Sequence, residues 1–143
     1  MKFLYHSRTY PAMSNFVILL VRIFIGFSMI LLHGLPKLEK YMSGGPFNFY
    51  EFLGLSAGAT MLLALIVEIV ASFLLIIGLF TRPAALLLMV TMLVAAFGAH
   101  AADAFSVRES SLLYFVIYLL IFTVGPLQYS VDQMLMKRRE TRW

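Results

Sequence analysis

Four apolar segments, each close to the length that crosses a bilayer, most limit what this chain can fold into. They cover about residues 15–32, 57–80, 83–101 and 110–124. A transmembrane α-helix needs about 20 predominantly apolar residues. Hydrophobic residues make up 62% of the 143 and charged residues only 13%, a balance too apolar for one soluble core of this size. The sequence therefore predicts one integral membrane domain, 1–143, that is all-α. Its four transmembrane helices form a bundle with antiparallel neighbours.

The first apolar segment follows a basic stretch, as the core of a signal peptide does. It is longer than such a core, contains Arg22 and lacks a small-residue cleavage site before His33. We therefore expect a retained transmembrane helix that stops near Gly34 and Pro36, because proline interrupts helical hydrogen bonding.

Basic residues lie between and beyond the apolar segments, as topology signals do, and form no patch suited to nucleic acid. With four spans, both termini and the 81–83 turn share one side of the membrane. That side holds seven of the eleven basic residues: Lys2, Arg8, Arg82, Lys137, Arg138, Arg139 and Arg142. The other side holds Lys37, Lys40 and Arg108. This excess predicts that both termini are cytoplasmic.

Two ionisable residues, Arg22 and Glu68, fall inside the predicted spans. At 1.5 Å per residue they lie about 12 Å and 18 Å from the same membrane face, a difference that the long arginine side chain can bridge. Because a charge in hydrocarbon costs at least about 2.5–3.5 kcal/mol, we expect a buried Arg22–Glu68 ion pair. The pair either fixes the helix register alone, or lines a ligand pocket or proton relay.

A second polar group gathers near the opposite face, consisting of His33, Lys37, His100, Asp103 and Glu109. Glu109 is expected to begin the fourth helix, where a negative charge is favourable. The group either binds a ligand headgroup and exchanges protons, or consists of ordinary interfacial residues in contact with water. The two histidines would suit a haem iron, and His33, His100 and Asp103 a metal ion, but no spacing signature supports either, and we predict no metal site.

Aromatic residues form two further candidate features. Tyr114 and Tyr118 share a face of the fourth predicted helix, where they either stack on a flat ring such as a quinone or serve as packing and interface anchors. The aromatic residues of 47–52 are expected to lie in the membrane interface. The chain has no cysteine and no phosphate-loop, dinucleotide, nucleophile-elbow or metalloprotease motif, so it shows no apparatus for thiol, covalent or metal-hydrolytic catalysis.

Several short motifs resemble, in their order and spacing, those of the DoxX family of small four-span membrane proteins. They are the arginine and glycine of residues 21–26, the sequence HGLPK at 33–37, the glutamate that ends 64–68, GLFTRPAA at 78–85 and GPLQYSVD at 125–132. In the last motif a leucine stands where the family usually has a second glycine. The positions that match the family pattern are Arg22, His33, Lys37, Glu68 and Arg82.

That family includes the small membrane subunit of thiosulfate:quinone oxidoreductase, and other members are linked to complexes that handle sulfur or oxidative stress. The resemblance implies a membrane subunit in a prokaryotic plasma (inner) membrane that binds a quinone-like amphiphile. Arg22–Glu68 would form its polar floor, and His33 and His100 would exchange protons. A separate redox partner protein would supply electrons. The sequence leaves open whether the chain forms a homo-oligomer. The alternatives are a non-catalytic scaffold or assembly factor and a small solute or lipid transporter, so whether the chain is an enzyme stays undecided.

Overall fold

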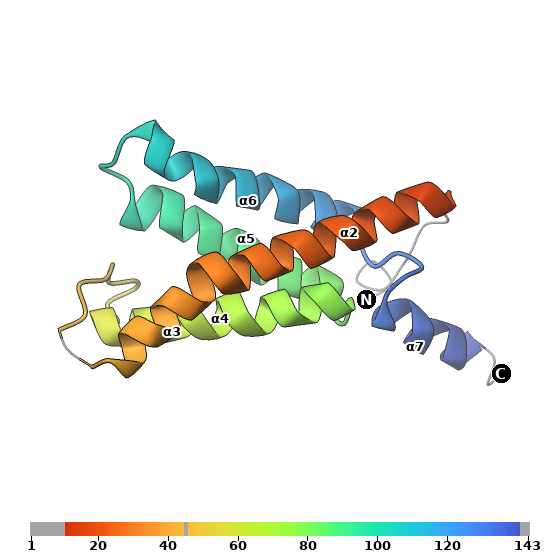
Figure 1. Ribbon diagram of the computed structural model, residues 1–143, viewed down its shortest axis with the longest axis horizontal. Helices are drawn as coiled ribbons and strands as arrows, with labels where there is room; N and C mark the ends of the chain where they lie inside the picture. Colours follow the sequence, from red (N-terminus) through yellow and green to blue (C-terminus); the bar gives the residue numbers. More distant parts are fainter. Residues whose placement is uncertain (1–10, 45, 141–143) are drawn as a thin grey trace.

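The computed structural model describes residues 11–44 and 46–140, and every regular element among them is helical (Figure 1). In chain order these elements are α2 (Ala12–Met29), the π-helical turn η1 (Ile30–Gly34), α3 (Leu35–Met42), α4 (Ala57–Ile77), α5 (Thr81–Val94), the π-helical turn η2 (Ala95–Ala99), α6 (Phe105–Val124) and α7 (Val131–Glu140). Four continuous helices are long and apolar enough to cross a membrane: Ala12–Met42, Ala57–Ile77, Thr81–Ala99 and Phe105–Val124. The all-α prediction with four potential spans is confirmed.

The four long helices pack as a bundle whose sequential members run in opposite directions (Figure 1). Contacts join α2 to α4, α4 to α5, α5 to α6, and α6 back to α2. The start of α2 and the whole of α7 lie at one end of the bundle, here called the α7 end. Residues 46–56 and the turn 100–104 lie at the opposite end. Which compartment each end faces stays a prediction, and Lys2, Arg8 and Arg142, on which it partly rests, lie outside the described residues.

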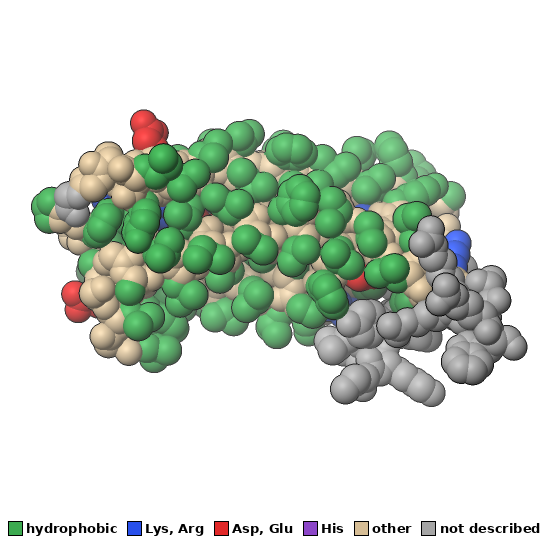
Figure 2. All heavy atoms as spheres, turned by 90° about the horizontal axis from the view of Figure 1, so that it is seen from below, with side chains coloured by type: hydrophobic (Ala, Val, Ile, Leu, Met, Phe, Trp, Pro, Cys, Tyr) green, Lys and Arg blue, Asp and Glu red, His purple; other side chains and the backbone are tan. Residues whose placement is uncertain are grey.

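The surface of the bundle carries the apolar belt expected of a protein surrounded by lipid. Figure 2 shows hydrophobic side chains covering the middle of one face, with acidic side chains projecting at the end opposite α7. Phe24, Phe73 and Phe97 are among many large apolar side chains that stay exposed in the chain alone. Soluble monomers rarely expose so large a continuous apolar surface. The belt therefore faces hydrocarbon.

The interior of the bundle is packed closely around fully buried side chains such as Met29, Leu75 and Leu88. Gly26 allows α2 to approach α4, because a Cβ atom at this position would lie only 2.5 Å from the Cγ1 atom of Ile76. Small residues at helix crossings have this role in membrane bundles, where close van der Waals packing drives association.

The first helix does not stop near Gly34 and Pro36, as the sequence predicted, but continues to Met42. Proline lacks an N–H group, and in an α-helix its ring clashes with the carbonyl four residues earlier. The widened turn η1 opens the helix at this point, and the Leu35 N–H donates to the Ile30 carbonyl five residues back. The 31-residue helix is about 46 Å long, so it exceeds the bilayer core of about 30 Å. It lies diagonally across the bundle (Figure 1).

Candidate functional site

The predicted ion pair between Arg22 and Glu68 is not formed, although both side chains are buried, with exposures of 1% and 2%. Arg22 Nη2 donates to the backbone carbonyl of Tyr129 at the α7 end. Glu68 Oε1 pairs instead with Lys37 Nζ. Depth explains the difference. Arg22 Nη1 packs beside Gly78, ten residues beyond Glu68 and therefore about 15 Å farther along the helix direction.

Arg22 belongs to a polar cluster that joins helix ends at the α7 end of the bundle. At Gly78, the left-handed residue that ends α4, a Cβ would lie 2.6 Å from Arg22 Nη1. At Gly125, which ends α6, a Cβ would lie 2.6 Å from Arg82 Nη2. Both guanidinium groups thus lie at the carboxyl ends of helices, where the helix dipole favours positive charge.

Asp132 provides the negative charge of this cluster. Its Oδ1 accepts a hydrogen bond from the Phe80 N–H at 2.9 Å, and its Oδ2 accepts from the N–H and the hydroxyl of Thr81, both at 2.9 Å. A carboxylate at this point stabilises the amino end of α5. Sequence reasoning did not select Asp132 as a site residue, although it ends the 125–132 motif. The cluster holds the start of α7 and the residue Tyr129 before it against the bundle.

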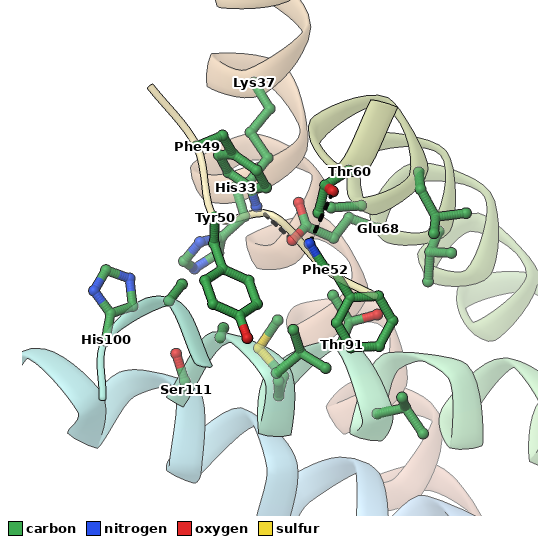
Figure 3. A pocket seen from close by; sticks show the side chains of 18 of the residues that line it. His33, Lys37, Phe49, Tyr50, Phe52, Thr60, Glu68, Thr91, His100 and Ser111 are labelled. Carbon is green, nitrogen blue, oxygen red and sulfur yellow. Dashed lines mark hydrogen bonds and ion pairs between the residues drawn. The ribbon is translucent and has the colours of Figure 1, made fainter. Parts of the chain in front are cut away.

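A pocket of about 430 Å³ lies between the helices towards the opposite end of the bundle (Figure 3). Its walls are mainly apolar residues of α4, α5 and α6. Its polar groups come from the first helix, from α4, α5 and α6, and from the turn after η2. The residues with most bearing on its chemistry are His33, Lys37, Glu68, Thr91, His100 and Ser111.

The Lys37–Glu68 pair is the principal charged feature of the pocket (Figure 3). Glu68 lies near the middle of α4, so its carboxylate is held at about the mid-depth of the membrane. Lys37 extends from α3 and remains 22% exposed. The second carboxylate oxygen of Glu68 is buried and has no hydrogen-bond partner in the part of the chain that the structure describes. Ionisable residues at such depth are costly, and by default they mark functional sites.

Both π-helical turns lie in the pocket wall, and each brings a histidine with it. His33 belongs to η1, and His100 directly follows η2. The ring of Tyr114 meets His33 edge-on, with 5.3 Å between ring centroids. His100 Nδ1 is 2.7 Å from Asp103 Oδ2. Single π-helical turns are frequent at functional sites, because they shift the helix face presented on either side.

The aromatic segment 47–52, which the sequence placed in the membrane interface, forms a lid on the pocket. The Phe52 N–H donates to Thr60 Oγ1 at 3.1 Å, which ties the lid to α4. Tyr50 projects from the lid into the pocket (Figure 3). Its ring packs on Gly98 of η2, where a Cβ would lie 3.0 Å from the ring carbons. The lid therefore spans the distance between α4 and η2.

Some predicted site residues lie apart from the pocket. Glu109 is exposed and does not line it. It is also not in the first turn of its helix, because α6 begins four residues earlier at Phe105. Tyr114 and Tyr118 do not line the pocket either, and their rings contact each other with centroids 6.0 Å apart. Within residues 11–44 and 46–140, no group of three or more His, Cys, Asp or Glu residues could hold a metal ion.

Comparison with known proteins covers the part of the chain that carries most of the pocket. The sequence profile of the DoxX family matches residues 17–101. An uncharacterized protein of Haemophilus influenzae is 33% identical over 120 residues, which cover 77% of this chain and 84% of that protein. No solved structure matches the chain. The profile match spans more than half of the sequence, including the Lys37–Glu68 pair, and the chain therefore belongs to the DoxX family.

Proposed function

We propose that this protein is a membrane subunit of a quinone-linked redox complex in a prokaryotic plasma membrane, and that it binds a quinone-like amphiphile in the pocket. One observation carries the proposal: Glu68, buried at mid-membrane depth and paired with the partly exposed Lys37, borders an apolar cavity. A charge pair that only fixed helix register would need no cavity beside it, whereas a site for a polar ring needs both.

The pocket suits a flat ring with polar edges. Its volume of about 430 Å³ lies in the range of about 300–1,000 Å³ that is typical of small-molecule sites. Apolar side chains such as Val67 and Val94 can hold the ring faces, while polar side chains that include His33, Lys37 and His100 lie among them. Such sites use a small number of polar groups to orient a ligand in an otherwise apolar cavity.

The polar groups also match the proton requirement of quinone chemistry. A bound quinone supplies two-electron redox chemistry, and its conversion to the hydroquinone consumes two electrons and two protons. The electrons come from a separate partner protein that oxidises a reduced sulfur compound, because this chain has no cysteine and no dinucleotide motif. His100, with a side chain 42% exposed and hydrogen-bonded to Asp103, takes protons from water. Lys37 and His33 present N–H donors deeper in the pocket.

The test is purification of the full chain in a mild detergent, followed by solvent extraction and quantification of bound quinone. We expect quinone to co-purify with the wild-type protein and occupancy to fall at least about tenfold in Glu68→Gln. Glu109→Gln is the matched control, since it makes the same chemical change on the exposed surface of α6. Circular dichroism reports whether each variant is folded.

Four outcomes are decisive. Loss of quinone from folded Glu68→Gln, with normal occupancy in Glu109→Gln, supports the proposal. Equal occupancy in both variants contradicts the role given to Glu68. A wild-type bundle without quinone but with a tightly bound protein partner would favour a non-catalytic scaffold or assembly factor, and a bound solute or lipid would favour the transporter alternative.

A further inference from the structure

We infer that the pocket opens sideways into the hydrocarbon between α4 and α5, so that its ligand arrives from the lipid and keeps an apolar tail in the bilayer. The inference rests on the proposed function only for the identity of the ring. The opening is called the lateral portal and is defined by Leu63, Leu87 and Val90. These three residues line the pocket and are also 46%, 52% and 48% exposed, respectively.

The helix geometry produces this opening. The sharp turn at Gly78 holds α4 and α5 together at the α7 end, and the two helices diverge towards the other end (Figure 1). Pocket residues on α4 are 60, 63, 64, 67 and 68, and those on α5 are 87, 90, 91, 92 and 94, of which all but Met92 recur at spacings of three and four. Spacings of three and four residues define one face of each helix. The pocket-lining faces of α4 and α5 therefore extend to apolar residues that are also exposed on the outside of the bundle.

The depth of the portal places it in lipid rather than in water. Val90 is the central residue of the span Thr81–Ala99. Leu87 lies one turn closer to the α7 end, about 18 Å from Ala99 at 1.5 Å per residue. The hydrocarbon core is about 30 Å thick. Leu87 and Val90 therefore face acyl chains near the middle of the bilayer.

The opposite end of the pocket is covered and polar. Tyr50 and Phe52 of the lid lie over it, and His100 lies to the side of Tyr50 at the turn after η2 (Figure 3). A ligand that satisfies both ends has a polar ring near His33 and His100 and an apolar chain that leaves through the portal. This selects a membrane-dissolved, tailed amphiphile over a water-soluble ring.

The first experiment tests the portal independently of any quinone. The full chain is reconstituted in vesicles containing a phospholipid with a diazirine in the middle of one acyl chain, and labelled residues are located by mass spectrometry after illumination. We expect labelling of the pocket wall at Glu68 or Thr91. Leu87→Trp should reduce that labelling at least about fivefold by filling the opening. Leu86→Trp is the matched control, since Leu86 is 47% exposed on the same turn but does not line the pocket.

The second experiment tests the tail. In nanodiscs, binding of a long-tailed ubiquinone is compared with binding of dimethoxy-methyl-benzoquinone, the same ring without a tail. We expect Leu87→Trp to weaken binding of the long-tailed quinone at least about tenfold and binding of the tail-less ring less than about twofold. Leu86→Trp should leave the binding of both quinones unchanged.

The two experiments separate failure of the portal from failure of the proposed function. No labelling of the pocket wall, or equal labelling in Leu87→Trp and Leu86→Trp, overturns the portal. Equal effects of Leu87→Trp on both quinones overturn the inferred path of the tail. Portal-dependent labelling in a protein that binds neither quinone supports the portal and contradicts the quinone function.

Discussion

Replacing Lys37 with methionine removes one charge of the buried pair while keeping most of the length of the side chain. The partner carboxylate of Glu68 is 2% exposed, and its second oxygen already lacks a hydrogen-bond partner. Removing one member of a buried pair leaves an uncompensated charge and costs about 3–5 kcal/mol. Glu68→Gln should lower the free energy of unfolding by less, about 1–2 kcal/mol. The reason is that Lys37 is 22% exposed and its flexible stem can turn its ammonium towards water.

The double variant Lys37→Met/Glu68→Gln distinguishes a true pair from two separate effects. With both charges absent, we expect a free energy of unfolding within about 1 kcal/mol of the wild type. The coupling energy of the cycle should then be at least about 2 kcal/mol. Denaturing-detergent titrations in mixed micelles, followed by circular dichroism, measure the four free energies.

Lys40→Met is the matched control for this cycle, because Lys40 is an exposed lysine on the same helix. Its free energy of unfolding should stay within about 0.5 kcal/mol of the wild type. Additive effects of the two single changes at Lys37 and Glu68 would refute the pairing, as would equal losses from Lys37→Met and Lys40→Met.

Three further predictions concern the packing of the bundle, and the same titrations test them. Gly78→Ala should destabilise by about 1–3 kcal/mol more than Gly54→Ala. Both glycines have a positive φ, but only at Gly78 would the new Cβ meet Arg22, whereas the space around Gly54 is open; equal losses would contradict the crowding. Asp132→Asn should cost about 2–3 kcal/mol, because an amide cannot accept all three hydrogen bonds from the amino end of α5, and a loss below about 0.5 kcal/mol would exclude that capping role. Tyr118→Phe should be neutral or stabilising, since the buried hydroxyl has no close hydrogen-bond partner among the described residues, and a loss above about 1 kcal/mol would indicate a hydrogen bond to Ser72 or through water.

The four spans follow from the sequence because hydropathy depends only on local composition. The charge of a residue inside a span is equally visible, and both Arg22 and Glu68 are indeed buried. Their partners were not predictable in the same way. Whether Arg22 or Lys37 pairs with Glu68 depends on whether the first helix ends at Pro36. The π-helical turn that lets this helix continue has no signature in apolar periodicity.

The candidate site was foreseen only in part. Its histidines and Lys37 were expected to gather at one end, because alternate ends of antiparallel spans meet there, and the structure brings them around one pocket. Glu68 was assigned to the other cluster. The lid was recognised as aromatic, but its closure on the pocket depends on the hydrogen bond between Phe52 and Thr60 and on the contact of Tyr50 with Gly98. Such contacts between distant segments leave no local pattern in a single sequence.

The buried charges of this bundle fall into two groups that differ in what satisfies them. The charged groups of Arg22, Arg82 and Asp132 each lie beside the end of a helix, where unpaired backbone groups and the helix dipole favour the charge. Glu68 lies in the middle of α4, where every backbone group is already hydrogen-bonded within the helix and offers it nothing. Its compensation comes from a lysine on another helix, beside a cavity that a tighter apolar packing would have filled. The helix ends account for the charges at the α7 end, whereas the packing around Glu68 gives no comparable compensation, and this difference supports the proposed ligand site in the pocket.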